Sequence, residues 1–281
     1  MNHFPCLSTS IELTNLCNLD CTMCQRRNMK RTHGHMDLNL LKKIIDQKFP
    51  ISWFHQWGEP LLYPHLREVL EYFKHNGQGD GATDGAISTN AILMNKAKRE
   101  ILLENANMVL CCVDSARPNA YNKIRNNKHY DLVCENIRKL IEEKIKTNSP
   151  CKIFIQLLRT IYNSDENIQE LINMFGSVPL YRETECRKHV YGQDISLKDP
   201  KRNPDHDSKI ECAKKAELII LWNGDCMNCC WDFDGEDCIG NANETSLIDI
   251  WEGARRRDFE HRMENKKFSK VCDKCLGPYL A

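Results

Sequence analysis

Three cysteines stand close together near the start of the sequence. They are Cys17, Cys21 and Cys24, with the spacing C-x3-C-x2-C. Thiolates are the usual ligands of iron–sulfur clusters, and a four-iron cluster that takes only three of them keeps one iron open to another ligand. A closed structural zinc site needs four protein ligands, so a zinc knuckle is the alternative interpretation. The spacing favours a cluster-binding loop with one open iron.

A second group of thiols lies in the C-terminal part of the chain. Asn223-Gly224 separates two strand-like runs and predicts a hairpin, which would bring Cys229 back towards Cys212. Together with Cys272 and Cys275 these residues make a four-thiol set, and spacing alone allows either zinc or an iron–sulfur cluster there. Three further thiols are alternatives to one of these ligands: Cys226, Cys230 and Cys238.

Composition restricts the classes of partner. The 281 residues include 39 basic and 39 acidic side chains, so no net field favours nucleic acid or an anionic membrane. No apolar run approaches the roughly 20 residues of a membrane span, and the N-terminus lacks the features of a signal peptide. We therefore expect a cytoplasmic protein, in which 16 cysteines indicate metal or redox chemistry and not disulfides.

The elements that must position the first three cysteines alternate between strand and helix. Hydrophobic patterns predict strands over residues 7–13, 51–57, 86–90, 108–113 and 152–158. Helical patterns fall over 37–45, 64–76, 96–105, 132–146 and 165–175, the first with Asp37 as its N-cap. This alternation is typical of a parallel sheet with crossover helices. Residues 180–209 are polar and are expected to cross to a second module.

Polar groups follow the predicted strands at one end. Glu59, Asn90 and Asp114 each come just after a strand, as Cys17 does. Ligands of parallel α/β folds bind at the carboxyl ends of the strands, so these residues are expected to meet at one site. Each has a simpler interpretation as well: Gly58-Glu59-Pro60 as an ordinary turn, and Ser88-Thr89-Asn90 as a strand cap.

The combination resembles the radical S-adenosylmethionine (SAM) enzymes. Gln56-Trp57-Gly58-Glu59-Pro60 is similar to the family's Gly-Gly-Glu-Pro segment, with Trp57 where the first glycine is usual. Ser88-Thr89-Asn90 is similar to its Thr-Asn-Gly, with Ala91 in the glycine position, and Arg125 resembles an arginine that holds the SAM carboxylate. A solvated surface arginine is the alternative for Arg125. The resemblance implies these SAM-binding residues: Met23, Gln56, Gly58, Glu59, Pro60, Ser88, Thr89, Asn90, Asp114 and Arg125.

The C-terminal pattern resembles the SPASM/twitch extension of the same enzymes. The expected fold is therefore α/β, with a partial (β/α)6 radical SAM barrel over 1–184, a linker over 185–211 and a small twitch-like α+β domain over 212–281. The resemblance implies two [4Fe-4S] clusters, one at Cys17, Cys21 and Cys24 and an auxiliary one. The auxiliary ligands would be Cys212, Cys229, Cys272 and Cys275.

Size and layout are similar to those of an aminocyclitol (2-deoxy-scyllo-inosamine) dehydrogenase. This favours radical oxidation of a small, sugar-like alcohol, with an electron donor such as flavodoxin or ferredoxin. Modification of a ribosomally made peptide is the competing activity, although only six residues precede the first predicted strand, where a peptide-docking domain would stand. A zinc-stabilised binding module is the non-enzyme alternative. Arg187, His189 and Tyr191 are the candidates for a general base.

Overall fold

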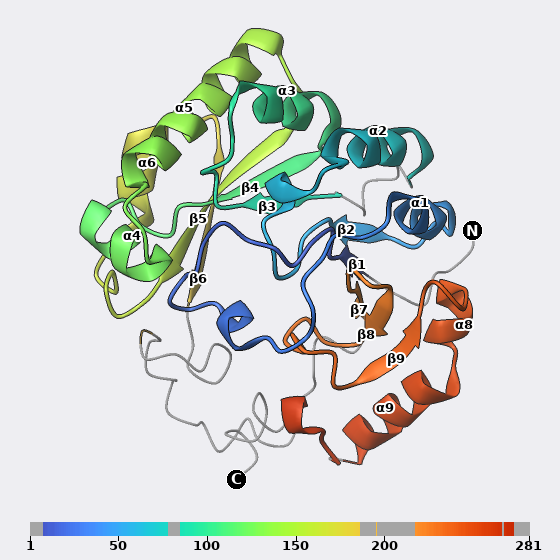
Figure 1. Ribbon diagram of the computed structural model, residues 1–281. Coiled ribbons are helices and arrows are strands. Elements are labelled where there is room, and N and C mark those ends of the chain that lie inside the picture. Colours follow the sequence, from blue (N-terminus) through green and yellow to red (C-terminus); the bar gives the residue numbers. More distant parts are fainter. Residues whose placement is uncertain (1–7, 78–84, 186–194, 196–216, 266, 273–281) are drawn as a thin grey trace.

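The barrel expected from the sequence is present in the computed structural model, which describes residues 8–77, 85–185, 195, 217–265 and 267–272 (Figure 1). Its six strands are β1 (Ser8–Ile11), β2 (Ile51–Trp53), β3 (Ile87–Thr89), β4 (Met108–Cys112), β5 (Lys152–Arg159) and β6 (Leu180–Glu185). β1 pairs with β2, and β3 to β6 pair in order, all in parallel. The amide of Phe54 donates to the carbonyl of Ala86 (2.9 Å) and links β2 to β3. The predicted partial barrel is confirmed.

Helices cover the outer side of these strands, as Figure 1 shows for α1, α2, α3, α5 and α6. The barrel helices are α1 (Leu38–Asp46), α2 (Leu66–Asn76), α3 (Lys96–Asn105), α4 (Pro118–Arg125), α5 (Tyr130–Thr147) and α6 (Ile168–Phe175), with short 3-10 turns at Gln25–Asn28 and Pro60–Leu62. The carboxylate of Asp37 accepts hydrogen bonds from the amides of Asn39 and Leu40, which confirms the predicted N-cap of α1.

Strand β6 was not predicted from the sequence. We expected residues 180–209 to form a crossing, but residues 180–185 extend the barrel sheet, with Leu180 opposite Phe154 of β5. The sequence LYRETE lacks an apolar face because β6 is an edge strand of its sheet, where charged side chains reach solvent. The barrel therefore has one more strand than the hydrophobic pattern indicated.

The C-terminal strands continue the barrel sheet. β7 (Glu217–Ile220) pairs in parallel with β1, and β8 (Asp225–Met227) and β9 (Cys238–Asn241) follow in antiparallel order. The predicted Asn223-Gly224 hairpin joins β7 to β8, and Gly224 has the positive φ of +90° that glycine permits there. In the sheet order β2-β1-β7-β8-β9, β8, which leads to Cys229, is separated from the first strand of the barrel by β7 alone.

Helix α8 (Leu247–Trp251) packs on the same hydrophobic core as the barrel. It begins at an N-cap, Ser246, whose hydroxyl accepts from the amide of Asp249. Buried side chains of α8 belong to one continuous cluster with those of α1 and α2, and α9 (Ala254–Glu264) lies beside β9 (Figure 1). The predicted boundaries at 184/185 and 211/212 fall next to or inside segments outside the described residues.

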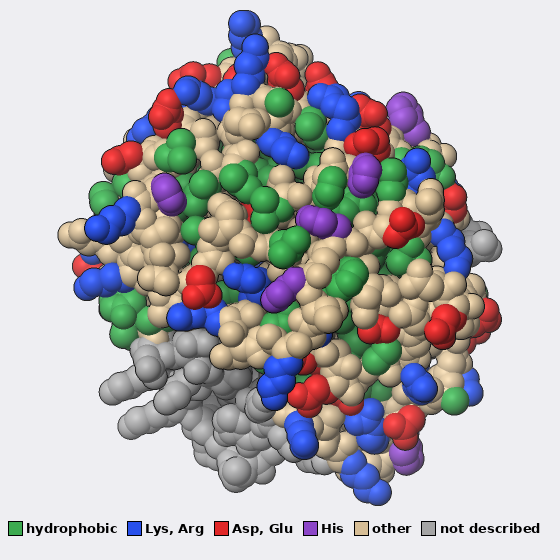
Figure 2. Space-filling model, in the orientation of Figure 1, with side chains coloured by type: hydrophobic (Ala, Val, Ile, Leu, Met, Phe, Trp, Pro, Cys, Tyr) green, Lys and Arg blue, Asp and Glu red, His purple; other side chains and the backbone are tan. Residues whose placement is uncertain are grey.

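The surface of the described residues carries both signs of charge. Lysine and arginine side chains alternate with acidic ones across the face drawn in Figure 2, and no large region of one sign appears on it. Among the described helices, none combines the length and apolar character that crossing a membrane requires.

Candidate active site

A cavity of about 390 Å³ opens at the carboxyl ends of the barrel strands, beneath the cysteine loop. This volume lies in the range of small-molecule sites. The predicted residues that line it are Cys17, Cys21, Met23, Cys24, Gln56, Gly58, Glu59, Ser88, Thr89, Asn90 and Arg125. Cys230, an alternative auxiliary ligand, also lines it, together with residues to which no role was assigned from the sequence, among them Ser8, Ser10, Trp53, His55, Cys112, Gln156, Arg182, Glu217 and Trp231.

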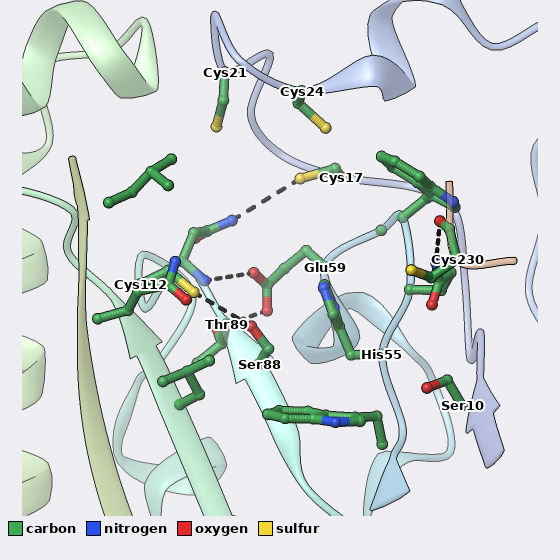
Figure 3. Close-up of a pocket in the computed structure, with 18 of the residues that line it drawn as sticks. Ser10, Cys17, Cys21, Cys24, His55, Glu59, Ser88, Thr89, Cys112 and Cys230 are labelled. Atoms are coloured by element: carbon green, nitrogen blue, oxygen red, sulfur yellow. Dashed lines mark hydrogen bonds between the residues drawn. The ribbon is translucent and has the colours of Figure 1, made fainter. Parts of the chain in front are cut away.

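The three predicted cluster ligands converge at the top of this cavity. Figure 3 shows the sulfur atoms of Cys17, Cys21 and Cys24 directed towards a common space. Burial raises the pKa of Cys17 to about 12 and that of Cys24 to about 11, so their thiolates need a positively charged partner. In the described part of the chain, no three histidine, cysteine or acidic side chains are arranged to hold a single metal ion. Three thiolates are the donor set of a four-iron cluster that keeps one iron open.

The cysteine loop is fixed by hydrogen bonds from its own polar residues to α4 and to β3. The amide of Thr22 donates to the carbonyl of Ile124 (3.0 Å), and its hydroxyl donates to the carbonyl of Lys123 (2.7 Å). On the other side, the amide side chain of Asn90 donates to Asn18 Oδ1 (2.9 Å). These bonds hold the loop over the cavity before any cofactor arrives, because all of their partners belong to the barrel.

Gly58 and Glu59 join the loop to the barrel. A Cβ on Gly58 would lie 2.2 Å from the carbonyl oxygen of Thr14, so only glycine allows the close approach of these two backbone segments. Glu59 is buried, and its carboxylate accepts hydrogen bonds from Thr89 Oγ1 (2.7 Å) and from the amide of Asn90 (2.9 Å). Burial raises the pKa of the Glu59 carboxyl. The predicted SAM-binding segments are thereby tied to one another.

Trp57, which replaces the usual first glycine of the motif, packs against the second cysteine group. Its ring makes edge-to-face contacts with Trp231 (ring centroids 6.2 Å apart) and Phe233 (5.8 Å). Its neighbour Gln56 donates from Nε2 to the carbonyl of Cys230 (2.7 Å). The departure from the family motif therefore has a local explanation, because the tryptophan fills a contact that a glycine would leave empty.

Ala91 also stands where the family has glycine, and its backbone has a positive φ of +62°. This left-handed conformation costs a residue with a Cβ roughly 1–2 kcal/mol, so the glycine of the resemblance fits the backbone observed here. Two hydrogen bonds to the Ala91 backbone stabilise this conformation. Thr89 Oγ1 accepts from the amide of Ala91 (3.0 Å), and the Asn136 side chain donates to the carbonyl of Ala91 (2.9 Å).

Asp114 and Arg125 form a buried ion pair below Cys21. The guanidinium lies 2.5 Å from the Asp114 carboxylate and donates to the carbonyl of Cys112 (2.8 Å). A third contact, 3.6 Å long, joins it to Cys21 Sγ. Arg125 is therefore no surface arginine, although in this structure much of its hydrogen-bonding capacity is taken by protein groups. Gln156 Nε2 donates to the other oxygen of Asp114 (3.2 Å).

The auxiliary cysteines are described only in part. Cys212 and Cys275, like the base candidates Arg187, His189 and Tyr191, lie outside the described residues. Interaction with the neighbouring Cys230 thiol, together with burial, raises the pKa of Cys229, and Cys272 is close enough to Cys229 for their charges to interact. Of the spare thiols, Cys226 is fully buried in the core and Cys238 is bonded to the Gly240 carbonyl (3.3 Å).

A buried salt bridge lies where the segment after the first cysteine loop contacts the loop that follows Cys229 and Cys230. Arg31, which follows the cysteine loop, pairs with Glu12 of the segment after β1 (2.5 Å) and donates from Nε to the carbonyl of Phe233 (2.6 Å). The Asp234 carboxylate in turn accepts from the amides of Lys30 (2.6 Å) and Arg31 (3.3 Å). The loop that follows Cys229 and Cys230 is thus held against the first cysteine loop.

Two family models match the chain. That of the radical SAM superfamily matches residues 11–174, and that of the iron–sulfur cluster-binding SPASM domain matches residues 212–276. The first covers the barrel up to α6, and the second covers the C-terminal cysteine group. Proteins with these domains bind a [4Fe-4S] cluster with SAM and additional iron–sulfur clusters, respectively.

Similar proteins carry several activities. A tungsten-containing aldehyde ferredoxin oxidoreductase cofactor-modifying protein of Pyrococcus furiosus is 23% identical over 94% of this chain and 85% of its own length. The crystal structure of BtrN in complex with AdoMet and 2-DOIA has a TM-score of 0.61 at 17% identity, covering 97% and 93%. Streptococcus suis SuiB bound to precursor peptide SuiA has a TM-score of 0.69 at 16% identity, covering 88% of this chain and 65% of SuiB. At these identities the two structures show the fold alone.

Proposed function

The chain belongs to the radical SAM superfamily and carries a SPASM domain, and on this basis we propose that it oxidises a small, sugar-like alcohol by hydrogen-atom abstraction. The chemistry supplied by the bound cofactors would be reductive cleavage of SAM to a 5′-deoxyadenosyl radical, which takes the carbinol hydrogen, and uptake of a second electron at the auxiliary cluster. The hydroxyl proton would pass to a general base, for which Arg187, His189 and Tyr191 are the candidates. An external donor such as flavodoxin or ferredoxin would supply the first electron.

The part of this chain in the reaction is to bind and orient. Cys17, Cys21 and Cys24 would hold the first cluster, and the resemblance assigns SAM to the residues around Glu59, Asn90 and Arg125. The Asp114 pair fixes the Arg125 guanidinium beside Cys21, so a positive charge is already in place where an anionic cluster would sit. Leu158 and Ile124, which are both buried, pack beside the loop and exclude water from this region.

One observation carries the oxidation proposal: residues of both cysteine groups line one cavity. Cys230 and Trp231, next to the predicted auxiliary ligand Cys229, form part of its wall together with Cys17, Cys21 and Cys24. A redox group held at Cys229 would therefore be adjacent to a substrate in the cavity. Such proximity suits a reaction in which a substrate radical must lose a second electron.

The direct test is anaerobic turnover of the reconstituted protein with SAM, a strong reductant and a set of cyclitols and sugars. We expect 5′-deoxyadenosine together with a ketone product, and transfer of deuterium from the labelled carbinol carbon into 5′-deoxyadenosine. Mass spectrometry measures all three. Formation of 5′-deoxyadenosine with no oxidised alcohol from any member of the set would overturn the proposed oxidation.

Cysteine variants separate the two groups. Cys17→Ala should abolish formation of 5′-deoxyadenosine, whereas Cys229→Ala should retain it and lose the oxidised product. Cys134→Ala is the matched control, because Cys134 is a buried thiol on α5 that packs in the core and does not line the cavity. Iron analysis of each variant should show a loss in the first two and none in the control.

Peptide modification is the second candidate, favoured by the structural similarity to SuiB with its precursor peptide. The observation that supports it is the opening of the cavity to the surface at the rim, where the exposed side chain of Arg182 lies. Incubation with a library of unstructured peptides under the same conditions tests this candidate. A peptide mass change of two hydrogens or a new crosslink, without oxidation of any alcohol, would favour it over the first proposal.

A further inference from the structure

We propose that Ser10, Trp53 and His55 form the substrate-binding wall of the cavity and recognise a neutral, polyhydroxylated ring. The inference deepens the proposed function, on which it rests for the identity of the site. None of the three residues belongs to the motifs that resemble the family, and all three line the same cavity as the predicted SAM contacts.

Backbone geometry brings the three side chains together. Ser10 of β1 is the register partner of Trp53 of β2, and His55 follows Trp53 by two positions. Alternate residues of an extended chain point to the same side, so Trp53 and His55 share a face. Phe54 between them points the other way, where its ring packs edge-to-face on Phe73 of α2 (5.0 Å). In Figure 3, His55 lies between Glu59 and Ser10 on the wall opposite Ser88 and Cys112.

This wall has polar groups without protein partners. His55 Nδ1 is shielded from solvent and has no hydrogen bond in the described part of the chain. The Ser10 hydroxyl also forms no hydrogen bond with the residues described, and the residue as a whole is 8% exposed. Unpaired polar groups in a buried position cost free energy, which a ligand that pairs with them would recover. A shielded, unpaired imidazole nitrogen on the same cavity wall as an unpaired hydroxyl indicates a binding site.

The chemistry of the wall selects the ligand class. Burial, with a further contribution from the charge of Arg125, lowers the pKa of His55 to about 4, so the imidazole is neutral at physiological pH. A neutral imidazole offers one donor and one acceptor, as a hydroxyl group does, and both suit alcohol groups. The indole of Trp53 offers an apolar face for the C–H side of a saturated ring. None of these three side chains carries a charge that would hold an ammonium or carboxylate.

The described carboxylates that line the cavity, those of Glu59 and Glu217, both belong to residues that already have interactions within the chain. Both oxygens of Glu59 accept bonds from the β3 segment, and Leu61 donates a further one (3.1 Å). An amino-substituted ring would therefore have to compete with these bonds for Glu59. We accordingly expect a neutral cyclitol or monosaccharide to bind more tightly than the aminated analogue of the same ring.

Equilibrium binding without turnover tests this inference. Calorimetric titrations would use reconstituted protein with SAM and no reductant, and the probes would be myo-inositol, a set of monosaccharides, an aminated cyclitol and a serine-containing peptide. We expect at least one neutral ring to bind, and its aminated analogue to bind about tenfold more weakly. Failure of every neutral ring to bind, or tighter binding of the aminated ring or the peptide, would overturn the inference.

Variants assign the binding to the wall. His55→Leu should weaken binding of the best neutral probe about tenfold, whereas His55→Gln, which keeps a donor and an acceptor, should stay within about threefold of the wild type. His35→Leu is the matched control: His35 also has a shielded Nδ1 without a partner among the described residues, but it lies outside the cavity. Equal binding by the two leucine variants would contradict the assignment to His55.

The binding experiments and the turnover experiment can fail independently of each other. Binding through His55 without any oxidised product would leave the binding wall in place and remove the dehydrogenase proposal. Oxidation of an alcohol whose binding does not depend on His55 or Ser10 would do the reverse. Where His55→Leu fails to fold or to load iron, His55→Gln and Ser10→Ala provide the same comparison with smaller changes.

Discussion

The two walls of the cavity differ in how their polar groups are used. On the β3–β4 side, Glu59, Asn90, Asp114 and Arg125 are bonded to one another or to the backbone. On the β1–β2 side, Ser10 and His55 Nδ1 have no partner among the described residues. Apart from Arg125 Nε, which has no hydrogen bond among the described residues, the polar groups of these four side chains are hydrogen-bonded or ion-paired. Such a wall holds its shape without a ligand, and it is the wall to which the family resemblance assigns SAM. The unpaired wall is the one left for a substrate that differs between relatives.

Breaking the buried pair should have the largest effect. Arg125→Met leaves the fully buried Asp114 carboxylate without its cation, and we expect a loss of about 3–5 kcal/mol in the free energy of unfolding. Denaturant titration of variant and wild type, with equal iron loading, measures it. Arg117→Met is the control, because Arg117 is 39% exposed in its pairs with Asp165 and Glu170, and such pairs contribute about 1 kcal/mol or less. Equal losses in the two variants would contradict the contrast between the walls.

Trp57 is expected to give the second-largest effect, because it joins the paired wall to the auxiliary loop. Trp57→Ala removes two edge-to-face contacts and the burial of an indole, at a cost of about 2–3 kcal/mol. Hydrogen exchange should become faster at the amides of Trp231 and Phe233 and stay unchanged in α5. Trp57→Phe, which keeps an aromatic edge, should show a smaller change. Protection of the loop that is as high in Trp57→Ala as in the wild type would disprove this role.

Much of the barrel was predictable, because the information for it is local. Asp37 caps α1 and Asn223-Gly224 turns a hairpin for reasons that depend on a few neighbouring residues. Strand β6 was missed because an exposed edge has no apolar face to detect. The parallel pairing of Ser8 with Glu217 was also missed, since residues so far apart in the sequence leave no local signal of their contact.

The candidate site, like the barrel, was predictable only where short local patterns carry the information. The spacing of Cys17, Cys21 and Cys24 and the Gly58-Glu59-Pro60 turn are short patterns that can be read directly. Ser10 and His55 belong to no pattern: the period of a strand indicates which residues share a face, but not that the face lines a cavity. Alternation between Phe54 and His55 is the one signal available, and it does not distinguish a binding residue from an ordinary polar position.

Glu59 provides a test of moderate size with a defined pH dependence. Burial raises the pKa of its carboxyl above the ordinary value of 4.5, so the folded protein retains a proton that the unfolded chain releases. The stability contributed by Glu59 is therefore complete below about pH 4.5 and decreases as the pH rises towards the folded-state pKa. Glu59→Gln cannot titrate, although it should cost about 1–3 kcal/mol through the mismatched hydrogen bonds.

The measurement is the difference in unfolding free energy between the wild type and Glu59→Gln across this pH range. We expect the advantage of the wild type to shrink as the pH rises from 4.5, with Glu68→Gln as the control. Glu68 is an exposed carboxylate of α2 whose pKa is lowered, first by its own backbone hydrogen bond. Its loss should make a difference of the opposite slope. A wild-type advantage at Glu59 that grows with pH would show that the hydrogen bonds outweigh burial.

Ser10→Ala should have the smallest effect on stability and sharpens the comparison most. Its hydroxyl has no partner in the described part of the chain, so its removal breaks no hydrogen bond of the protein, and we expect the free energy of unfolding to change by less than about 0.5 kcal/mol. Thr89→Val is the matched control on the paired wall, because Thr89 Oγ1 donates to Glu59 (2.7 Å) and accepts from Ala91 (3.0 Å). Its removal should cost about 1–3 kcal/mol. If Ser10→Ala were as destabilising as Thr89→Val, the polar groups of the two walls would contribute equally to stability, and the contrast between the walls would be wrong. If stability is unchanged and a neutral ring binds more weakly, the substrate is located at β1 and β2.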